Sequence, residues 1–257
     1  MMNRVGLFII MICLAMSVHG QETTVATQLG VGGADVLDTY LSPVKYKGVE
    51  WGFMSEVRRD SKKHDRLTYA LTHEGVFGYL HNGSGNAHEY VGHYDFSYAV
   101  MRRWNILDNR LTLYAGPMVD AMLGFNYNTR NSSNNPAQGY ASAALGLQGA
   151  ATYGVRLFGK DVKLGYELRM PVAGLMFSPN YGQSYYEIFN RGDYDHNIVF
   201  YSLSPCQLRQ QLTADVTLTP SMSLRLGYLC DIRQAKPNNL KQHHYYNAAI
   251  IGIVIRK

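Results

Sequence analysis

The chain has 257 residues, of which 46% are hydrophobic and 12% aromatic, and its 24 Lys and Arg against 19 Asp and Glu give a formal net charge of +5. Its mean hydropathy of −0.19 is that of an ordinary globular chain, and beyond the N-terminal leader no run of about 18 apolar residues occurs, which excludes a transmembrane helix. The basic residues are spread along the chain, which excludes a nucleic-acid-binding patch.

The N-terminal segment is typical of a secretory signal peptide. Arg4 precedes an apolar run from Val5 to Met16, and small residues after this run fit cleavage after Gly20. The run is too short to cross a bilayer as a helix. We therefore expect residues 1–20 to be a cleaved signal peptide and residues 21–257 to form one mature domain.

Long stretches of alternating apolar and polar residues follow the leader. In the first clear one, Val49, Trp51 and Phe53 alternate with residues that include Glu50. Such stretches run about 10 to 15 residues, whereas globular strands usually run about 5 to 6, and a tilted strand needs about 9 to 11 residues to cross a bilayer. The pattern predicts strands near 28–40, 47–58, 66–80, 88–103, 110–126, 140–157, 161–177, 205–218, 221–234 and 245–256.

Long strands of period two behind a signal peptide indicate an all-β fold, namely a transmembrane antiparallel up-and-down β-barrel of about ten strands, within a range of about eight to twelve. The alternative is a soluble secreted β-sandwich. A sandwich has little reason to place Tyr and Phe repeatedly at strand ends, whereas a barrel uses them as interfacial belts. Segment 192–203 stays ambiguous, since Ile198–Tyr201 either extends the next strand or stands alone.

The predicted connections alternate between short and long along the chain. In outer-membrane barrels the short turns face the periplasm and the long loops face the exterior. We therefore expect the connections at 59–65 and 104–109 to be periplasmic and those at 127–139 and 178–195 to be extracellular. An even number of strands then places both termini in the periplasm.

The polar side of the predicted strands carries nearly balanced charges, which we expect to fill the lumen. Because an unpaired buried charge is costly, these side chains should pair across strands. The predicted lumenal residues are His93, the acids Glu50, Glu56, Glu74, Glu89, Asp95, Asp120, Glu167, Asp215 and Asp231, and the bases Arg58, Arg66, Arg156, Lys163, Arg169, Arg209, Arg225 and Arg233.

A catalytic triad is suggested by His93, Asp95 and Ser97, which share one face of one strand. Same-face neighbours on a strand lie about 6.8 Å apart, so His93 and Ser97 are separated by about 13.6 Å. That distance is far beyond the reach of a base to its nucleophile, and a Gly-x-Ser-x-Gly elbow does not occur. We therefore predict no enzyme active site from the sequence.

The sequence gives no sign of a metal or cofactor site. His243 and His244 are adjacent, and we expect both in a solvated loop, because no Cys or carboxylate at a suitable spacing completes a metal site. The dense basic run from Arg58 to Arg66 is most simply a solvated periplasmic turn. We expect no nucleic-acid partner, and the expected partners are outer-membrane lipids and the barrel-assembly machinery.

Two cysteines of the mature chain, Cys206 and Cys230, lie on adjacent predicted strands joined by a turn at Pro220. A regular antiparallel ladder puts Cys230 opposite Gln210, and the two cysteines are then too far apart for a disulfide. Pro205 cannot donate to the ladder, so a bulge there would bring the sulfurs together. Both outcomes stay open.

The stretch YGQSYYEIF, residues 181–189, follows a breaker run in the longest predicted extracellular loop. Its side chains either anchor this loop over the barrel mouth or form a binding surface in which Tyr stacks on sugar or lipid. The candidate surface residues are Tyr181, Gln183, Tyr185, Tyr186, Glu187 and Phe189.

Four segments carry a resemblance to a known family: DVLDTYLSPVKYKG (Asp35–Gly48), YAGP (Tyr114–Pro117), NNPAQ (Asn134–Gln138) and FSPNYGQSYYEIF (Phe177–Phe189). In this order they resemble an uncharacterised outer-membrane β-barrel family of the Bacteroidetes, over nearly all of the mature chain. The resemblance implies an outer-membrane location and a barrel architecture. It implies no activity, so no catalytic residue is carried over.

Three functions are consistent with these observations. The first is a barrel with a side-chain-filled lumen that has a structural or surface-interaction role through its extracellular loops. The second is a narrow channel or a barrel that binds a small ligand or lipid. The third is an outer-membrane lipid hydrolase or acyltransferase, which requires a Ser or Thr paired with a His across strands.

Overall fold

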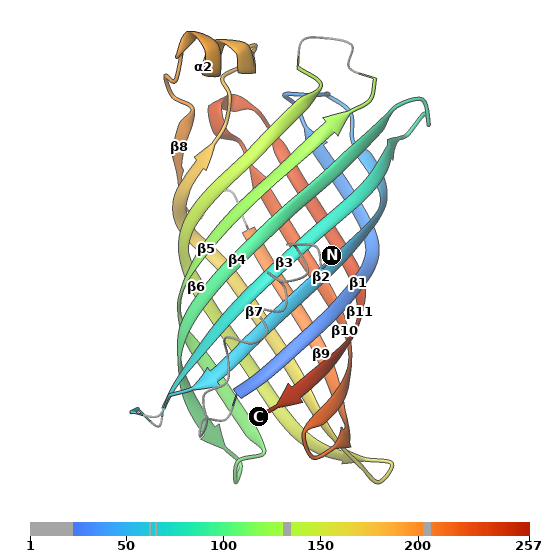
Figure 1. Ribbon diagram of the computed structural model, residues 1–257, viewed down its shortest axis with the longest axis vertical. Helices are drawn as coiled ribbons and strands as arrows, with labels where there is room; N and C mark the ends of the chain where they lie inside the picture. Colours follow the sequence, from blue (N-terminus) through green and yellow to red (C-terminus); the bar gives the residue numbers. More distant parts are fainter. Residues whose placement is uncertain (1–22, 62, 65, 131–134, 203–206) are drawn as a thin grey trace, which may run out of the picture.

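The computed structural model describes residues 23–61, 63–64, 66–130, 135–202 and 207–257. The predicted signal peptide lies outside these residues and stays a prediction. The chain forms a tall barrel of tilted strands (Figure 1). Its elements are β1 (Thr23–Asp38), β2 (Tyr46–Asp60), β3 (Leu67–Asn82), β4 (His88–Ile106), β5 (Leu111–Asn128), β6 (Ala137–Leu157), β7 (Lys160–Phe177), α2 (Tyr185–Arg191), β8 (Ile198–Tyr201), β9 (Gln207–Thr219), β10 (Met222–Ala235), the 3₁₀ turn η1 (Pro237–Asn239) and β11 (Gln242–Arg256).

The barrel closes because its first and last strands pair with each other. Strand β11 returns to β1 with Arg256 opposite Thr24, and β6 pairs with β7. Strands β8 and β9 both pair with β7, so they occupy one position end to end. The eleven described strands therefore fill ten positions, which confirms the predicted antiparallel barrel of about ten strands.

The structure corrects the longest predicted loop and resolves the ambiguity that follows it. The loop contains a helix, α2, and Ile198–Tyr201 is a short strand of its own beside the end of β7. Ser184 caps α2, with its side chain and that of Glu187 forming a reciprocal capping box, and Gly192 ends the helix in the left-handed conformation at φ 74°. Seven residues are too few for helical periodicity to show in the sequence.

The outer surface of the barrel is apolar. Large hydrophobic side chains point outward from the strands, with exposed fractions of 66% for Trp51, 66% for Leu145 and 68% for Phe200. Aromatic rings pair across strands near one end, as in Tyr79 and Tyr90 with ring centroids 5.0 Å apart. An outer face of this kind suits the hydrocarbon and the interface of a bilayer. Among the described helices, none is long and apolar enough to span a membrane.

The two ends of the barrel differ. The described chain begins and ends at one end, which we call the terminus end, and α2 lies beyond the opposite end, which we call the α2 end (Figure 1). Turns at the terminus end are short, as between β9 and β10, where Thr219 pairs with Met222. Segments at the α2 end are longer, so the alternation of loop lengths follows the predicted pattern.

Candidate functional site

Four buried side chains, Glu74, Glu167, Arg169 and Arg209, meet in the lumen near the middle of the strands, and we call them the central layer. Arg169 and Arg209 stand opposite each other on β7 and β9. Arg209 Nη2 lies 2.7 Å from a carboxylate oxygen of Glu74, and Arg169 Nε lies 3.1 Å from one of Glu167. The pair of Arg209 with Glu74 thus spans the barrel from β9 to β3.

Uncharged and sulfur-containing side chains surround the central layer and accept hydrogen bonds from its arginines. Arg169 donates to Ser97 Oγ at 2.9 Å, and Arg209 donates to Met54 Sδ at 3.0 Å. A hydrogen bond of 2.7 Å also joins two amide side chains of β9 and β1, Gln211 and Gln28. Strands β1 to β4, β7 and β9 thus all contribute to these contacts, and a cavity lies on each side of the central layer.

On the side of the terminus end, further ion pairs continue the network. Arg58 lies 2.6 Å from Glu56 and 2.9 Å from Glu167, so it joins β2 to β7. Arg225 contacts Asp215 through its Nε at 2.6 Å. These guanidinium groups make several charge-assisted hydrogen bonds each, which is the arrangement that offsets the cost of burying them.

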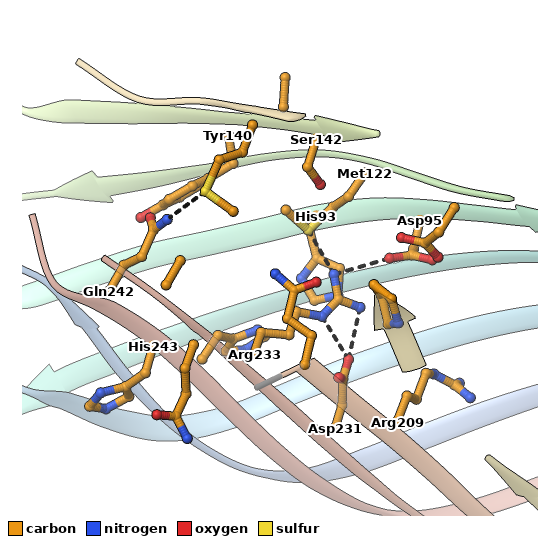
Figure 2. Close-up of a pocket in the computed structure, with 18 of the residues that line it drawn as sticks. His93, Asp95, Met122, Tyr140, Ser142, Arg209, Asp231, Arg233, Gln242 and His243 are labelled. Atoms are coloured by element: carbon orange, nitrogen blue, oxygen red, sulfur yellow. Dashed lines mark hydrogen bonds and ion pairs between the residues drawn. The ribbon is translucent and has the colours of Figure 1, made fainter. Parts of the chain in front are cut away.

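On the side of the α2 end, Arg233 is the central cation (Figure 2). It lies 3.0 Å from Asp95 and 2.8 Å from Asp231, and it donates to Met122 Sδ at 2.7 Å. Figure 2 shows these groups converging from β4, β5 and β10 on one space. Asp95 and Asp231 therefore share one guanidinium.

Two histidines stand beside this group. His244 Nε2 lies 2.9 Å from both carboxylate oxygens of Glu50, and the ring of His93 meets that of His244 edge to face with centroids 5.1 Å apart. Nε2 of His93 is buried and has no hydrogen-bond partner among the described residues. The pair thus presents one imidazole nitrogen with unused hydrogen-bonding capacity.

A cavity of about 110 Å³ lies between the central layer and the α2 end. Polar and charged side chains line one part of it, and methionines and other apolar side chains line the rest. The cavity reaches toward the α2 end at Leu37 and Phe177. Its charged lining residues are balanced in number, three carboxyl and three guanidinium groups: Asp95, Asp120, Asp231, Arg169, Arg209 and Arg233. Tyr140 and the three histidines His93, His243 and His244 also line it.

Nearer the α2 end, a buried polar cluster surrounds Tyr140. Its hydroxyl donates to Asp38 and accepts from the Asn126 amide at 3.0 Å. Glu89 is 1% exposed, and its Oε1 has no hydrogen-bond partner in the described chain. Neither Asp38 nor Glu89 forms an ion pair with a described residue. Two buried carboxyl groups therefore lie close to Tyr140 and to each other, and neither is paired with a cation among the described residues.

The loop that carries α2 is fixed to the barrel by its buried side. The Tyr40 hydroxyl donates to the Gln183 carbonyl at 2.8 Å, and the Tyr185 hydroxyl donates to Gln138 at 2.9 Å and accepts from the Gly139 N–H at 2.6 Å. These contacts join the loop to β6 and to the segment after β1. The loop is anchored over part of the α2 end.

The other side of the same loop is exposed and aromatic. Tyr181 is 86% exposed, Tyr186 59% and Phe189 63%. The guanidinium of Arg191 lies 5.6 Å from the ring centre of Tyr186, within cation–π distance. The predicted surface stretch therefore divides into buried anchors and an outward aromatic face.

A family model described as a protein of unknown function, DUF3316, matches residues 14–256. The chain belongs to the DUF3316 family. No curated protein matches it. Solved structures do, and they show the fold of this DUF3316 chain.

The outer membrane protease OmpT from Escherichia coli aligns with a TM-score of 0.57 at 10% identity, over 94% of this chain and 99% of its own. The transport unit of the autotransporter AIDA-I from Escherichia coli aligns with a TM-score of 0.44 at 8% identity, over 94% and 92%. The translocator domain of the autotransporter NalP from Neisseria meningitidis gives 0.44 at 14%, over 98% and 95%. At such identities, the likeness to OmpT concerns the fold alone.

The structure of the DUF3316 chain brings most of the predicted lumenal residues into the barrel. The acids and His93 lie on the inner faces of their strands, although Glu89 and Asp120 form no ion pair within the described chain. Three predicted lumenal bases are exposed near the terminus end: Arg66, Arg156 and Lys163. Lys163 still lines the cavity on that side of the central layer, together with Glu167.

The prediction for the two adjacent histidines is wrong. Strand β11 begins at Gln242, three residues before the expected start, so His243 and His244 are strand residues on opposite faces. His243 lies 3.0 Å from Asp35, and His244 contacts Glu50 in the lumen. No cluster of three potential metal ligands occurs in the described chain.

The predicted pairing of the hairpin around Pro220 is confirmed from Ser223 to Arg233, whereas Met222 pairs with Thr219 and not with the expected Leu218. Cys230 stands opposite Gln210, as the regular ladder requires. A register shift separates Met222 from Ser223 at the turn itself. Cys206 lies outside the described residues, so the question of a disulfide stays open.

The cap of α2 gives a prediction about pH. The backbone N–H and hydroxyl of Ser184 donate to Glu187, which holds the pKa of that carboxyl below its ordinary value. Because the folded pKa is depressed, the cap is complete at neutral pH and is lost as the pH falls through that pKa. In an NMR titration, Ser184→Ala should raise the pH at the midpoint of the Glu187 carboxyl titration, because it removes one of the donors. The control Ser42→Ala should leave that midpoint unchanged. If Ser184→Ala also leaves it unchanged, the capping box is contradicted.

Proposed function

We propose that this protein is a non-conducting outer-membrane barrel that acts through its α2 end. The central layer carries this proposal, because its buried and paired side chains cross the lumen from β3 to β9. A ten-stranded barrel is only slightly wider than the eight-stranded barrels whose interiors side chains fill. A closed interior leaves the ends of the barrel as the surfaces that can interact.

The aromatic face of the α2 loop supports an interaction role. Exposed Tyr and Phe beside Arg191 combine flat apolar rings with a cation, which suits the headgroup region of a membrane or the faces of sugar rings. The buried contacts of Tyr185 and Gln183 hold this face in position. Outer-membrane lipids and the barrel-assembly machinery are the partners that we propose for the barrel itself.

A hydrolase or acyltransferase receives no such support. That function requires a Ser or Thr hydroxyl bonded to a histidine ring across strands, and no such bond joins side chains of the described residues. Ser97, on the same face as His93, accepts from Arg169 instead.

Planar-bilayer recording tests the closed lumen. Purified wild-type protein should give no stable conductance steps, because the central layer blocks the axis. Removing two of its cations, by Arg169→Ala with Arg209→Ala, should introduce steps. The matched pair Arg156→Ala with Lys163→Ala, at the exposed terminus end, should not. Large steady steps from the wild type would overturn the proposal.

Labelling of intact cells tests the orientation. An epitope tag inserted in the connection between β5 and β6, at 131–135, should be reached by antibody from outside. A tag at 60–62, on the terminus end, should be reached only after the cells are opened. The opposite result would mean that the aromatic face of α2 points to the periplasm.

A further inference from the structure

A cavity of about 580 Å³ lies at the terminus end of the barrel, and we call it the mouth cavity. The cations that line it come from four segments of the chain, namely the turn before β5 and the strands β6, β7 and β11. Its charged lining residues are four cations and one carboxyl group: Arg110, Arg156, Lys163, Arg256 and Asp161. The mouth cavity therefore has an excess of positive charge.

The carboxyl groups deeper in the lumen do not cancel this excess. A second cavity, of about 240 Å³, shares part of its lining with the mouth cavity and reaches inward to Glu167 of the central layer. Over the two cavities together, seven cations line the space against five carboxyl groups. Each of the four deeper carboxyl groups is already ion-paired with an arginine of the second cavity: Glu56 and Glu167 with Arg58, Asp215 with Arg225, and Asp60 with Arg103.

The three arginines of the mouth cavity make no ion pair with a carboxyl group of the described residues. Arg156 stands opposite Asp161 in the ladder between β6 and β7, yet the two side chains are not paired. Arg256 donates to Ser223 Oγ at 3.2 Å. Arg110 is fixed through its backbone, because its carbonyl accepts a hydrogen bond of 2.8 Å from β6. Their guanidinium groups therefore keep N–H donors for a ligand.

Hydroxyl groups add further donors to the same space. Thr112, Thr152 and Thr217 line the mouth cavity from β5, β6 and β9. A phosphate monoester has three terminal oxygens and close to two negative charges, so it accepts from several guanidinium and hydroxyl groups at once. A carboxylate has two oxygens and one charge. The volume of 580 Å³ lies within the range of about 300–1,000 Å³ that is usual for small-molecule pockets.

We propose that the mouth cavity binds a soluble small molecule that carries a phosphate monoester, with Arg110, Arg156 and Arg256 as its cationic contacts. Arg110 and Arg156 are exposed, so the ligand reaches them from the terminus end. The site lies at the end of the barrel opposite the α2 loop. The inference goes beyond the proposed surface role and does not depend on it.

Isothermal titration calorimetry of the full barrel in detergent and phosphate-free buffer tests this inference, with glycerol phosphate and succinate as the probes. At about pH 8 both probes carry close to two negative charges, because the second pKa of a phosphate monoester is about 6. Glycerol phosphate should bind at least about tenfold more tightly, since one additional charge-assisted hydrogen bond is worth that factor or more. Equal affinities, or no binding of glycerol phosphate, would overturn the proposal.

A third probe separates a soluble ligand from a lipid headgroup. Short-chain lysophosphatidic acid carries the same glycerol phosphate group on an acyl chain. It should bind no more tightly than glycerol phosphate, because the described contacts are to the phosphate alone. Binding that is tenfold tighter or more would assign the mouth cavity to a lipid headgroup and overturn the soluble ligand.

Variants then locate the site. Arg110→Gln with Arg156→Gln removes two exposed cations of the mouth cavity, so it should weaken glycerol phosphate binding about tenfold or more. Lys45→Gln with Lys47→Gln removes the same charge at the α2 end, where both lysines contact Asp35, and should leave the binding unchanged. Equal weakening by the two pairs would show attraction to the net charge of the protein and overturn the site.

Discussion

Replacing Leu147 by arginine should lower the free energy of unfolding in lipid vesicles by about 2–4 kcal/mol, the cost of a charge on the lipid face at the bilayer midplane. Leu147 lies in the middle of β6 and is 53% exposed on the outer face of the barrel. In a bilayer this exposed surface meets hydrocarbon. An arginine there must be drawn toward the headgroups or carry water with it.

Leu157 provides the matched control. It is the last residue of the same strand and is 44% exposed, so Leu157→Arg should cost only about 0–1 kcal/mol near the interface. Denaturant-induced unfolding from vesicles measures both. In a soluble sandwich, both substitutions would replace a solvent-exposed leucine by a charged residue that water solvates, so both would change the stability little. Equal and small effects of the two substitutions would therefore contradict the membrane barrel.

The strands can be predicted because one physical rule governs them all. A barrel wall separates lipid from a polar lumen, so each strand shows the same alternation over its full length, as at Trp51 and Glu50. Most of the register of the hairpin around Pro220 is predictable as well, because a short turn between antiparallel strands limits which residues can face each other, although a register shift follows Met222 at the turn. Cys230 opposite Gln210 is the result.

The structure differs from the sequence prediction where a short segment depends on a few local interactions. Helix α2 depends on one capping box at Ser184 and Glu187, and its seven residues are too short to show a helical period. The alternation misplaces His244 because β11 begins three residues earlier than the pattern indicates. At the end of a strand, an error of three residues in the predicted start decides whether a side chain is placed in a loop or in the lumen.

The partners within the lumen cannot be derived from the sequence. Which side chains face inward follows from parity, but which of them meet depends on the diameter of the barrel and the stagger of its strands. Arg58 meets Glu167 from β2 to β7, and Arg169 reaches Ser97 on β4. Balanced charge along the sequence therefore does not say which charged side chains meet inside the barrel.

Arg209→Ala should destabilise the barrel by about 3–5 kcal/mol, because it leaves the carboxylate of Glu74 buried without its partner. Glu74 is 2% exposed, and its Oε2 lies 2.7 Å from Arg209. Unfolding curves in vesicles measure the loss.

Two further variants separate the charge of this pair from its shape. Replacing both residues, by Arg209→Leu with Glu74→Leu, removes the two charges together and should cost much less than the single change. Arg102→Ala, at an exposed residue stacked on Trp104, is the control and should cost less than about 1 kcal/mol. If the double variant is as unstable as Arg209→Ala, the central layer owes its stability to the shapes of its side chains, and the ion pair between Arg209 and Glu74 is not what holds it.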